Sequence, residues 1–191
     1  MKKIVLAGFT LFISILLTAQ QKKIAVRIEQ GSESILVGNQ EITLSKAPFK
    51  MVVSLHHLDG VYLFASFSDS IYRLQAEEAV PDFKNLPYLA IAEASFNEDK
   101  ELIINTDGWA FWFYDPELDW HRFDKDILVT KDSVVGTKTI NQFYIPDTKS
   151  AIPVSDNTKP LYLFFLAIDK SSKDGVPKKE LVRLKMKIYF E

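Results

Sequence analysis

Apolar and polar positions alternate along much of the chain after residue 20, and this alternation predicts β-strands. Ile24, Val26 and Ile28 take every second position of the first such segment, so one face of that strand meets a core and the other meets water. Residues 182–190 repeat the pattern, with apolar side chains at every second position and mostly basic ones between them. Residues 161–169, LYLFFLAID, are apolar on both faces, which predicts a central strand.

Two hairpins are predicted where turn residues separate alternating segments. Residues 49–57 and 61–67 flank the sequence LDG, and an Asp-Gly pair in such a place favours a hairpin because Gly accepts a positive φ without steric cost. A smaller hairpin is expected between residues 35–37 and 42–44, which a Gly-Asn pair separates.

The pattern changes between residues 69 and 96, where Ala, Leu, Glu and Gln replace β-branched residues. Residues 86–96 contain good helix formers, with Asn85 as a candidate cap and Pro87 in the first turn, so we expect one short helix there. A further buried strand is the alternative, because a short apolar segment does not distinguish the two by periodicity.

Strand signals return in the second half of the chain, at residues 102–105, 109–114, 120–123, 127–130 and 139–145. About ten short strands joined mostly by hairpins, with one short helix, indicate an all-β fold, and we expect an antiparallel β-sandwich. A lipocalin-like β-barrel is the alternative. No internal repeat or domain-scale linker is visible, so residues 21–191 are expected to form a single domain.

The first twenty residues differ from all of this and resemble a cleaved signal peptide. Lys2 and Lys3 precede an apolar segment, residues 4–17, that is short for a membrane span and ends in small and polar residues. An uncleaved anchor is the alternative. The chain contains no cysteine, which excludes disulfides and a lipid-bearing cysteine. We therefore expect an exported protein, periplasmic or secreted and not a lipoprotein, with no membrane span after cleavage.

Charge narrows the range of partners. Loss of Lys2 and Lys3 would change the formal net charge from −2 to −4, because no other charged residue lies in the first twenty. A mildly acidic chain with an evenly mixed surface charge is not typical of proteins that bind nucleic acid or anionic membranes. A carbohydrate or an envelope protein remains the expected kind of partner, and the oligomeric state is left open.

Residues 107–124, DGWAFWFYDPELDWHRFD, hold all three tryptophans of the chain and one of its three histidines. On a regular strand Trp109, Phe111 and Phe113 share one face, whereas Trp112 and Tyr114 share the other. If the second face is not covered, its aromatic rings form a platform that suits a sugar or a partner protein. The candidate ligand-binding residues are Trp109, Trp112, Tyr114, Trp120, His121 and Arg122. The alternative is that both faces are buried in a central sheet.

Catalytic and metal-binding motifs are scarce. His56 and His57 are adjacent and point to opposite faces of a strand, so they do not ligate one metal ion together, and we expect His57 to have a structural role. No nucleophile elbow or zinc-binding helix pair is present, and we expect no cofactor and no metal. A hydrolase that uses carboxylates in residues 115–124 to cleave envelope or extracellular polymers is the catalytic alternative.

Two short segments, DSI at 69–71 and DSV at 132–134, resemble the Asp-Ser/Thr-apolar acceptor pattern for O-glycosylation of exported proteins in Bacteroidetes. The resemblance implies Ser70 and Ser133 as acceptors. The sequence as a whole favours a non-catalytic binding or interaction module that uses an aromatic patch. A hydrolase and a structural envelope component without a small ligand are the alternatives.

Overall fold

The computed structural model describes residues 21–38, 40–58, 60–73, 89–97, 99, 101–106, 110–115, 120–121, 123–124, 128–169 and 180–191, and for 89–93 and 120–121 it describes the backbone alone. The proposed signal peptide, residues 1–20, lies outside these ranges. Within them, no helix has the length and the apolar character needed to cross a membrane.

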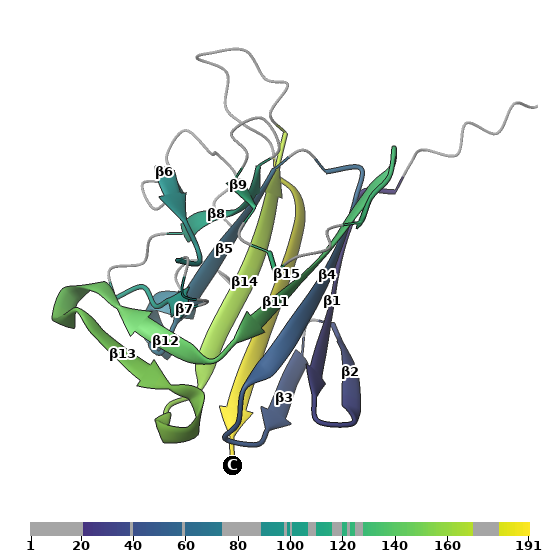
Figure 1. The fold of residues 1–191 in the computed structure, drawn as a ribbon. Coiled ribbons are helices and arrows are strands. Elements are labelled where there is room, and N and C mark those ends of the chain that lie inside the picture. Colours follow the sequence, from purple (N-terminus) through teal and green to yellow (C-terminus); the bar gives the residue numbers. More distant parts are fainter. Residues whose placement is uncertain are drawn as a thin grey trace, which may run out of the picture.

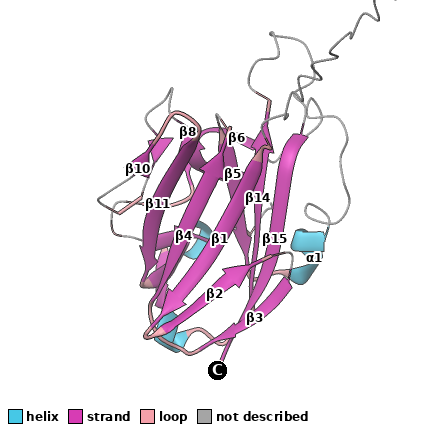
Figure 2. Ribbon diagram, turned by 90° about the vertical axis from the view of Figure 1, so that its right-hand side faces the viewer, coloured by secondary structure: helices cyan, strands magenta, loops and turns pink. Residues whose placement is uncertain are grey.

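The described strands form three sheets (Figures 1 and 2). The five-stranded sheet has the order β10 (Leu128–Val129), β11 (Ser133–Ile140), β4 (Phe49–His56), β1 (Lys23–Gln30) and β2 (Glu33–Val37). The seven-stranded sheet has the order β3 (Gln40–Leu44), β15 (Glu180–Phe190), β14 (Leu161–Ile168), β5 (Val61–Ser66), β8 (Ala110–Asp115) and β6 (Leu89–Ala94), and β9 (Trp120–His121) pairs with β8. The three-stranded sheet contains β13 (Ser150–Pro153), β12 (Gln142–Ile145) and β7 (Glu101–Ile103).

The predicted all-β sandwich is confirmed. The inward side chains of β1 and β4 join those of β5, β14 and β15 in one buried cluster, in which Val26, Val53, Leu163, Phe165 and Met186 are at most 1% exposed. In the described part of the chain none of the three sheets closes on itself, so the lipocalin-like alternative is not what the sequence adopts.

The central strands β5 and β14 are buried on both faces, as the apolar sequence of residues 161–169 predicts. Their outer side chains form a second buried cluster with α1 (Asp69–Tyr72) and part of β8. Phe64 and Phe164 stack there with ring centroids 5.0 Å apart. Arg183 on β15 lies over the Phe164 ring, 5.5 Å from Cζ to the centroid. The seven-stranded sheet therefore separates two apolar layers.

Both predicted hairpins are wrong in their pairing. β4 pairs with β1 and β11, whereas β5 pairs with β14 and β8, so the chain changes sheets between them. His57, directly before the predicted turn, has a positive φ of 51°. A turn residue, however, does not fix whether the next strand pairs or crosses the core.

The smaller hairpin fails in the same way. β2 pairs with β1 through a two-residue turn at Gly31 and Ser32, and β3 pairs in parallel with β15 in the other sheet. Gly31 adopts a φ of 60°, which explains a glycine at that position. β2 thus lies at an edge of the five-stranded sheet, and β3 lies at an edge of the seven-stranded sheet.

Residues 89–94, which fall in the predicted helix, form the strand β6, so the alternative of a further strand is correct there. β6 pairs in parallel with β8, and this tertiary pairing outweighs the local helix propensity of Leu and Ala. The single strand predicted at residues 139–145 is divided between two strands in the structure. β11 ends at Ile140, and β12 begins at Gln142 in a different sheet.

The Phe123 ring lies so close to position 136 on β11 that only glycine fits there. A Cβ added at position 136 would lie 2.5 Å from Cγ of the Phe123 ring. We expect Gly136→Ala to lower the free energy of unfolding by about 1–3 kcal/mol, the usual cost of overpacking. Chemical denaturation of the variant and the parent measures this loss of stability. Gly38→Ala is the matched control because nothing lies within 4 Å of its added Cβ. Equal stability of the two variants would contradict this packing.

Candidate functional site

The aromatic segment at 107–124 is described only in part. β8 pairs antiparallel with β9, with Tyr114 opposite His121 and Asp115 opposite Trp120, so the two predicted strands do pair, and residues 116–119 between them lie outside the described residues. Trp109 and Arg122 lie outside the described residues, and only the backbone of Trp120 and His121 is described.

Trp112 and Tyr114 are both buried, at 5% and 6% exposure. Trp112 stacks on Tyr62, with ring centroids 3.9 Å apart and an interplanar angle of 24°. Tyr114 lies 6.2 Å from Phe123, centroid to centroid, in the core between the main sheets. Neither ring lies open on the surface, which corresponds to the alternative of a covered central sheet for these two residues.

A β-bulge corrects the predicted division of faces. The register of β8 with β5 places Trp112 opposite Tyr62 but Tyr114 opposite Val61, which leaves Phe113 as one extra residue. Because of this residue, Tyr114 joins Phe113 in the main core, whereas Trp112 belongs to the outer cluster. Simple alternation had placed Trp112 and Tyr114 on the same face.

We expect Trp112→Ala to lower the free energy of unfolding by about 3–5 kcal/mol, because it leaves a cavity beside Tyr62. Urea denaturation followed by circular dichroism measures this loss. Leu128→Ala, which shortens a side chain that is 61% exposed, is the control and should change stability by less than about 0.5 kcal/mol. A Trp112→Ala variant as stable as the parent would identify Trp112 as a surface residue.

Two carboxylates of the aromatic segment, Asp115 and Asp124, are described, and both make contacts within the protein. Asp115 is completely buried, and together with burial it raises the pKa of Tyr62 above the ordinary tyrosine range, with burial as the larger cause. Asp124 accepts hydrogen bonds from the backbone N–H of Thr139, at 2.8 Å, and from its hydroxyl, at 2.5 Å. Glu117 and Asp119, the other carboxylates of residues 115–124, lie outside the described residues, so the hydrolase alternative stays a prediction.

The raised pKa of Tyr62 predicts a loss of stability in alkali. The folded state favours the neutral phenol, so its contribution is fully present below the unfolded pKa of about 10 and is lost as the pH rises further. We expect the free energy of unfolding to fall less steeply above pH 10 in Tyr62→Phe than in the parent. Denaturant titrations at several alkaline pH values test this, and parallel curves would contradict it.

A small pocket of about 160 Å³ lies at the end of β4 and contains one of the predicted candidates, Tyr114. His57 lines it, with its backbone N–H donating to Asp132 O at 2.9 Å and Nδ1 3.7 Å from Asp132 Oδ1. Ser133 lines it too, but the Ser133 hydroxyl is 2.8 Å from the Thr130 hydroxyl. Among the described contacts, the Ser133 hydroxyl has no hydrogen bond to His57. Ser133, His57 and Asp132 therefore do not form a hydrogen-bonded nucleophile, base and acid.

The two candidate O-glycosylation sites differ in exposure. Ser70 is exposed on α1, with its hydroxyl 3.0 Å from that of Ser68. Ser133 is half-buried at the start of β11. Glycosylation of either serine stays a prediction. Among the described residues, no three His, Asp or Glu side chains are grouped so that they could hold a metal ion.

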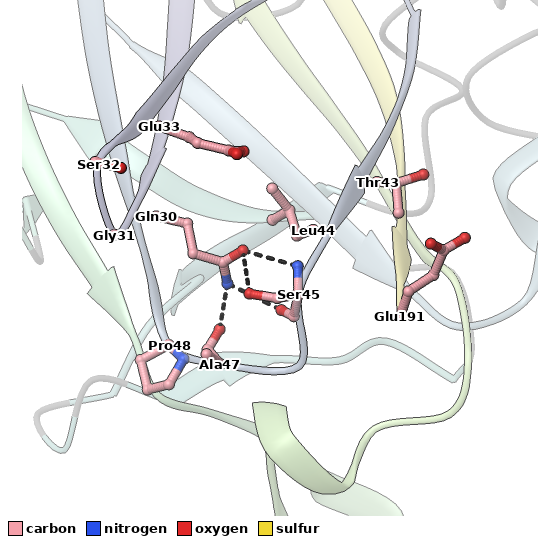
Figure 3. A pocket seen from close by; sticks show the side chains of 10 residues that line it. All are labelled: Gln30, Gly31, Ser32, Glu33, Thr43, Leu44, Ser45, Ala47, Pro48 and Glu191. Carbon is pink, nitrogen blue, oxygen red and sulfur yellow. Dashed lines mark hydrogen bonds between the residues drawn. The ribbon is translucent and has the colours of Figure 1, made fainter.

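A larger pocket, of about 550 Å³, lies at the opposite end of β4, where the chain passes from β3 back to the five-stranded sheet (Figure 3). This volume is within the range of small-molecule sites. The lining residues come from the β1–β2 turn, the end of β3 with the following loop, and the end of β15: Gln30, Gly31, Ser32, Glu33, Thr43, Leu44, Ser45, Ala47, Pro48 and Glu191. We call it the end pocket.

Gln30 holds the wall of the end pocket in place. Its Nε2 donates to the carbonyl oxygens of Ser45 and Ala47 at 2.9 and 2.7 Å, and its Oε1 accepts from the Ser45 N–H and hydroxyl, both at 2.8 Å (Figure 3). Backbone bonds tie the same loop to β15, from Glu191 N to Leu44 O and from Lys46 N to Glu191 O. The loop is thereby fixed to both main sheets.

The chemistry of the end pocket is polar and acidic. Ser32, Thr43 and Ser45 supply hydroxyl groups, Glu33 and Glu191 supply carboxylates, and no Lys or Arg lines it. Sequence reasoning did not find this site, because its walls come from three segments that carry no shared motif. Gln30 itself stands out in the sequence only as a polar residue at the end of an alternating strand, which does not mark a site.

Comparisons of the chain with protein-family models, with curated proteins and with solved structures find no match. The proposal of a function therefore rests on the end pocket and on the residues around it.

Proposed function

We propose that the protein is an exported, non-catalytic binding module that holds a neutral carbohydrate in the end pocket. The observation that carries the proposal is the hydrogen-bonded frame around Gln30, which fixes a polar, acidic cavity of about 550 Å³ at the end of the sandwich. Export rests on the basic and apolar sequence of residues 1–20.

The residues around the end pocket match the groups of a sugar. Carboxylates such as Glu33 accept hydrogen bonds from sugar hydroxyls, and the hydroxyl groups of Ser32 and Thr43 can donate or accept. Pro48, which is exposed, offers apolar surface to the C–H groups of a ring. Because the loop is already held by Gln30, little conformational entropy is lost when a ligand binds.

Charge favours neutral sugars over acidic ones. Glu33 and Glu191 are the charged residues that line the pocket, so a uronic acid or a sulfated sugar would meet like charge. This proposal keeps the expected class of partner but places the site away from Trp112 and Tyr114, which are buried. A structural envelope component, one of the two alternatives, would leave the pocket without a ligand.

Titration calorimetry with neutral hexose oligosaccharides and with their uronic-acid counterparts tests the proposal. We expect binding of at least one neutral oligosaccharide, weaker binding of its acidic counterpart, and a loss of about tenfold in affinity in Glu33→Gln, which corresponds to about 1.4 kcal/mol for one charged hydrogen bond.

Asp99→Asn is the matched control. It makes the same change of charge on an exposed turn before β7 and should leave the affinity unchanged. The proposal fails if no neutral oligosaccharide binds, or if Asp99→Asn weakens binding as much as Glu33→Gln does.

A further inference from the structure

The strand β2 forms an open edge of the five-stranded sheet. In the described part of the chain it pairs with β1 on one side and with no strand on the other, and it lies at the margin of the molecule (Figure 1). The sequence of this edge, ESILV, has no Pro or Lys, residues that commonly protect an edge from pairing. Leu36 is 71% exposed.

The register of β2 shows which backbone groups point away from the sheet. Gln30 and Glu33 flank the two-residue turn, so they form a hydrogen-bonded pair with β1, and Ile35 and Val37 follow at every second position. The N–H and C=O groups of Ser34 and Leu36 therefore point outward. Of these four groups, only the Leu36 carbonyl has a partner among the described residues, Gln40 Nε2 at 3.4 Å.

We propose that a second copy of this chain pairs with this edge, antiparallel and centred on Ile35. The two residues with outward groups lie symmetrically about Ile35, so Ser34 of each copy faces Leu36 of the other. Each such pair exchanges two backbone hydrogen bonds, which gives four across the interface. The two five-stranded sheets then form one continuous sheet.

The side chains of β2 also suit this arrangement. Ile35 meets Ile35 of the second copy on the inner face, where it already packs against the core. The two Leu36 side chains become diagonal neighbours on the outer face and shield each other from water. Glu33 faces Val37 of the second copy, so the pairing brings no like charges directly opposite each other.

Sedimentation velocity over a range of protein concentrations tests the pairing. We expect a reversible monomer–dimer equilibrium, and a dissociation constant at least tenfold higher in Leu36→Lys. Leu128→Lys is the matched control, since Leu128 is 61% exposed at the opposite edge of the same sheet and should leave the equilibrium unchanged. A parent that stays monomeric to 1 mM, or a dimer that Leu128→Lys disrupts as much as Leu36→Lys, overturns the proposal.

The absence of cysteine from the chain allows a second test, which reads the register directly. Opposite residues of a non-hydrogen-bonded antiparallel pair have Cα atoms about 4.5 Å apart, within reach of a disulfide. We expect Ile35→Cys to form a covalent dimer when oxidised glutathione is added. Glu33→Cys should stay monomeric, because the two copies of position 33 lie about 14 Å apart in this register. Cross-linking of Glu33→Cys but not of Ile35→Cys would contradict the proposed pairing.

Discussion

The rest of the structure depends on burying both faces of β5 and β14. Strands that are apolar on both faces require a covering layer on each side. The five-stranded sheet covers the inner face, and α1, Trp112 and the long side chains of β15 contribute to the layer on the outer face. The chain changes sheets repeatedly, after β2, β3, β4, β6, β7, β9, β11 and β13. These changes of sheet, more than any single turn, determine which strand pairs with which.

The sequence predicts the strands well where burial follows alternation, because side-chain direction is a local property of a strand. β1, β4 and β15 are examples. Pairing is not local, and it was predicted wrongly after β2 and after β4. A Gly-containing turn reverses the chain equally well into the same sheet or into the facing sheet, and the choice depends on which surfaces still need to be covered. The strand β6 follows the same logic, since its parallel pairing with β8 is decided by distant residues.

The aromatic segment shows how one residue limits a prediction from periodicity. A single bulged residue, Phe113, moves Tyr114 from the expected face to the main core. The stack of Trp112 on Tyr62 then completes the outer layer. The concentration of aromatic residues, which suggested a binding surface, is explained for these two rings by a sheet that must be covered on both faces.

The end pocket is a consequence of the same topology. The chain leaves the first sheet after β2, forms β3 in the second, and returns to β4 through the loop that Gln30 holds. Because β2 and β3 end their sheets at the same side, this double crossing also leaves the edge of β2 unpaired in the described part of the chain. The sequence does not reveal the pocket, since no motif joins Gln30, Ser45 and Glu191. Only the packing of the two sheets brings these three residues together, so the location of the site is a property of the fold and not of any one segment.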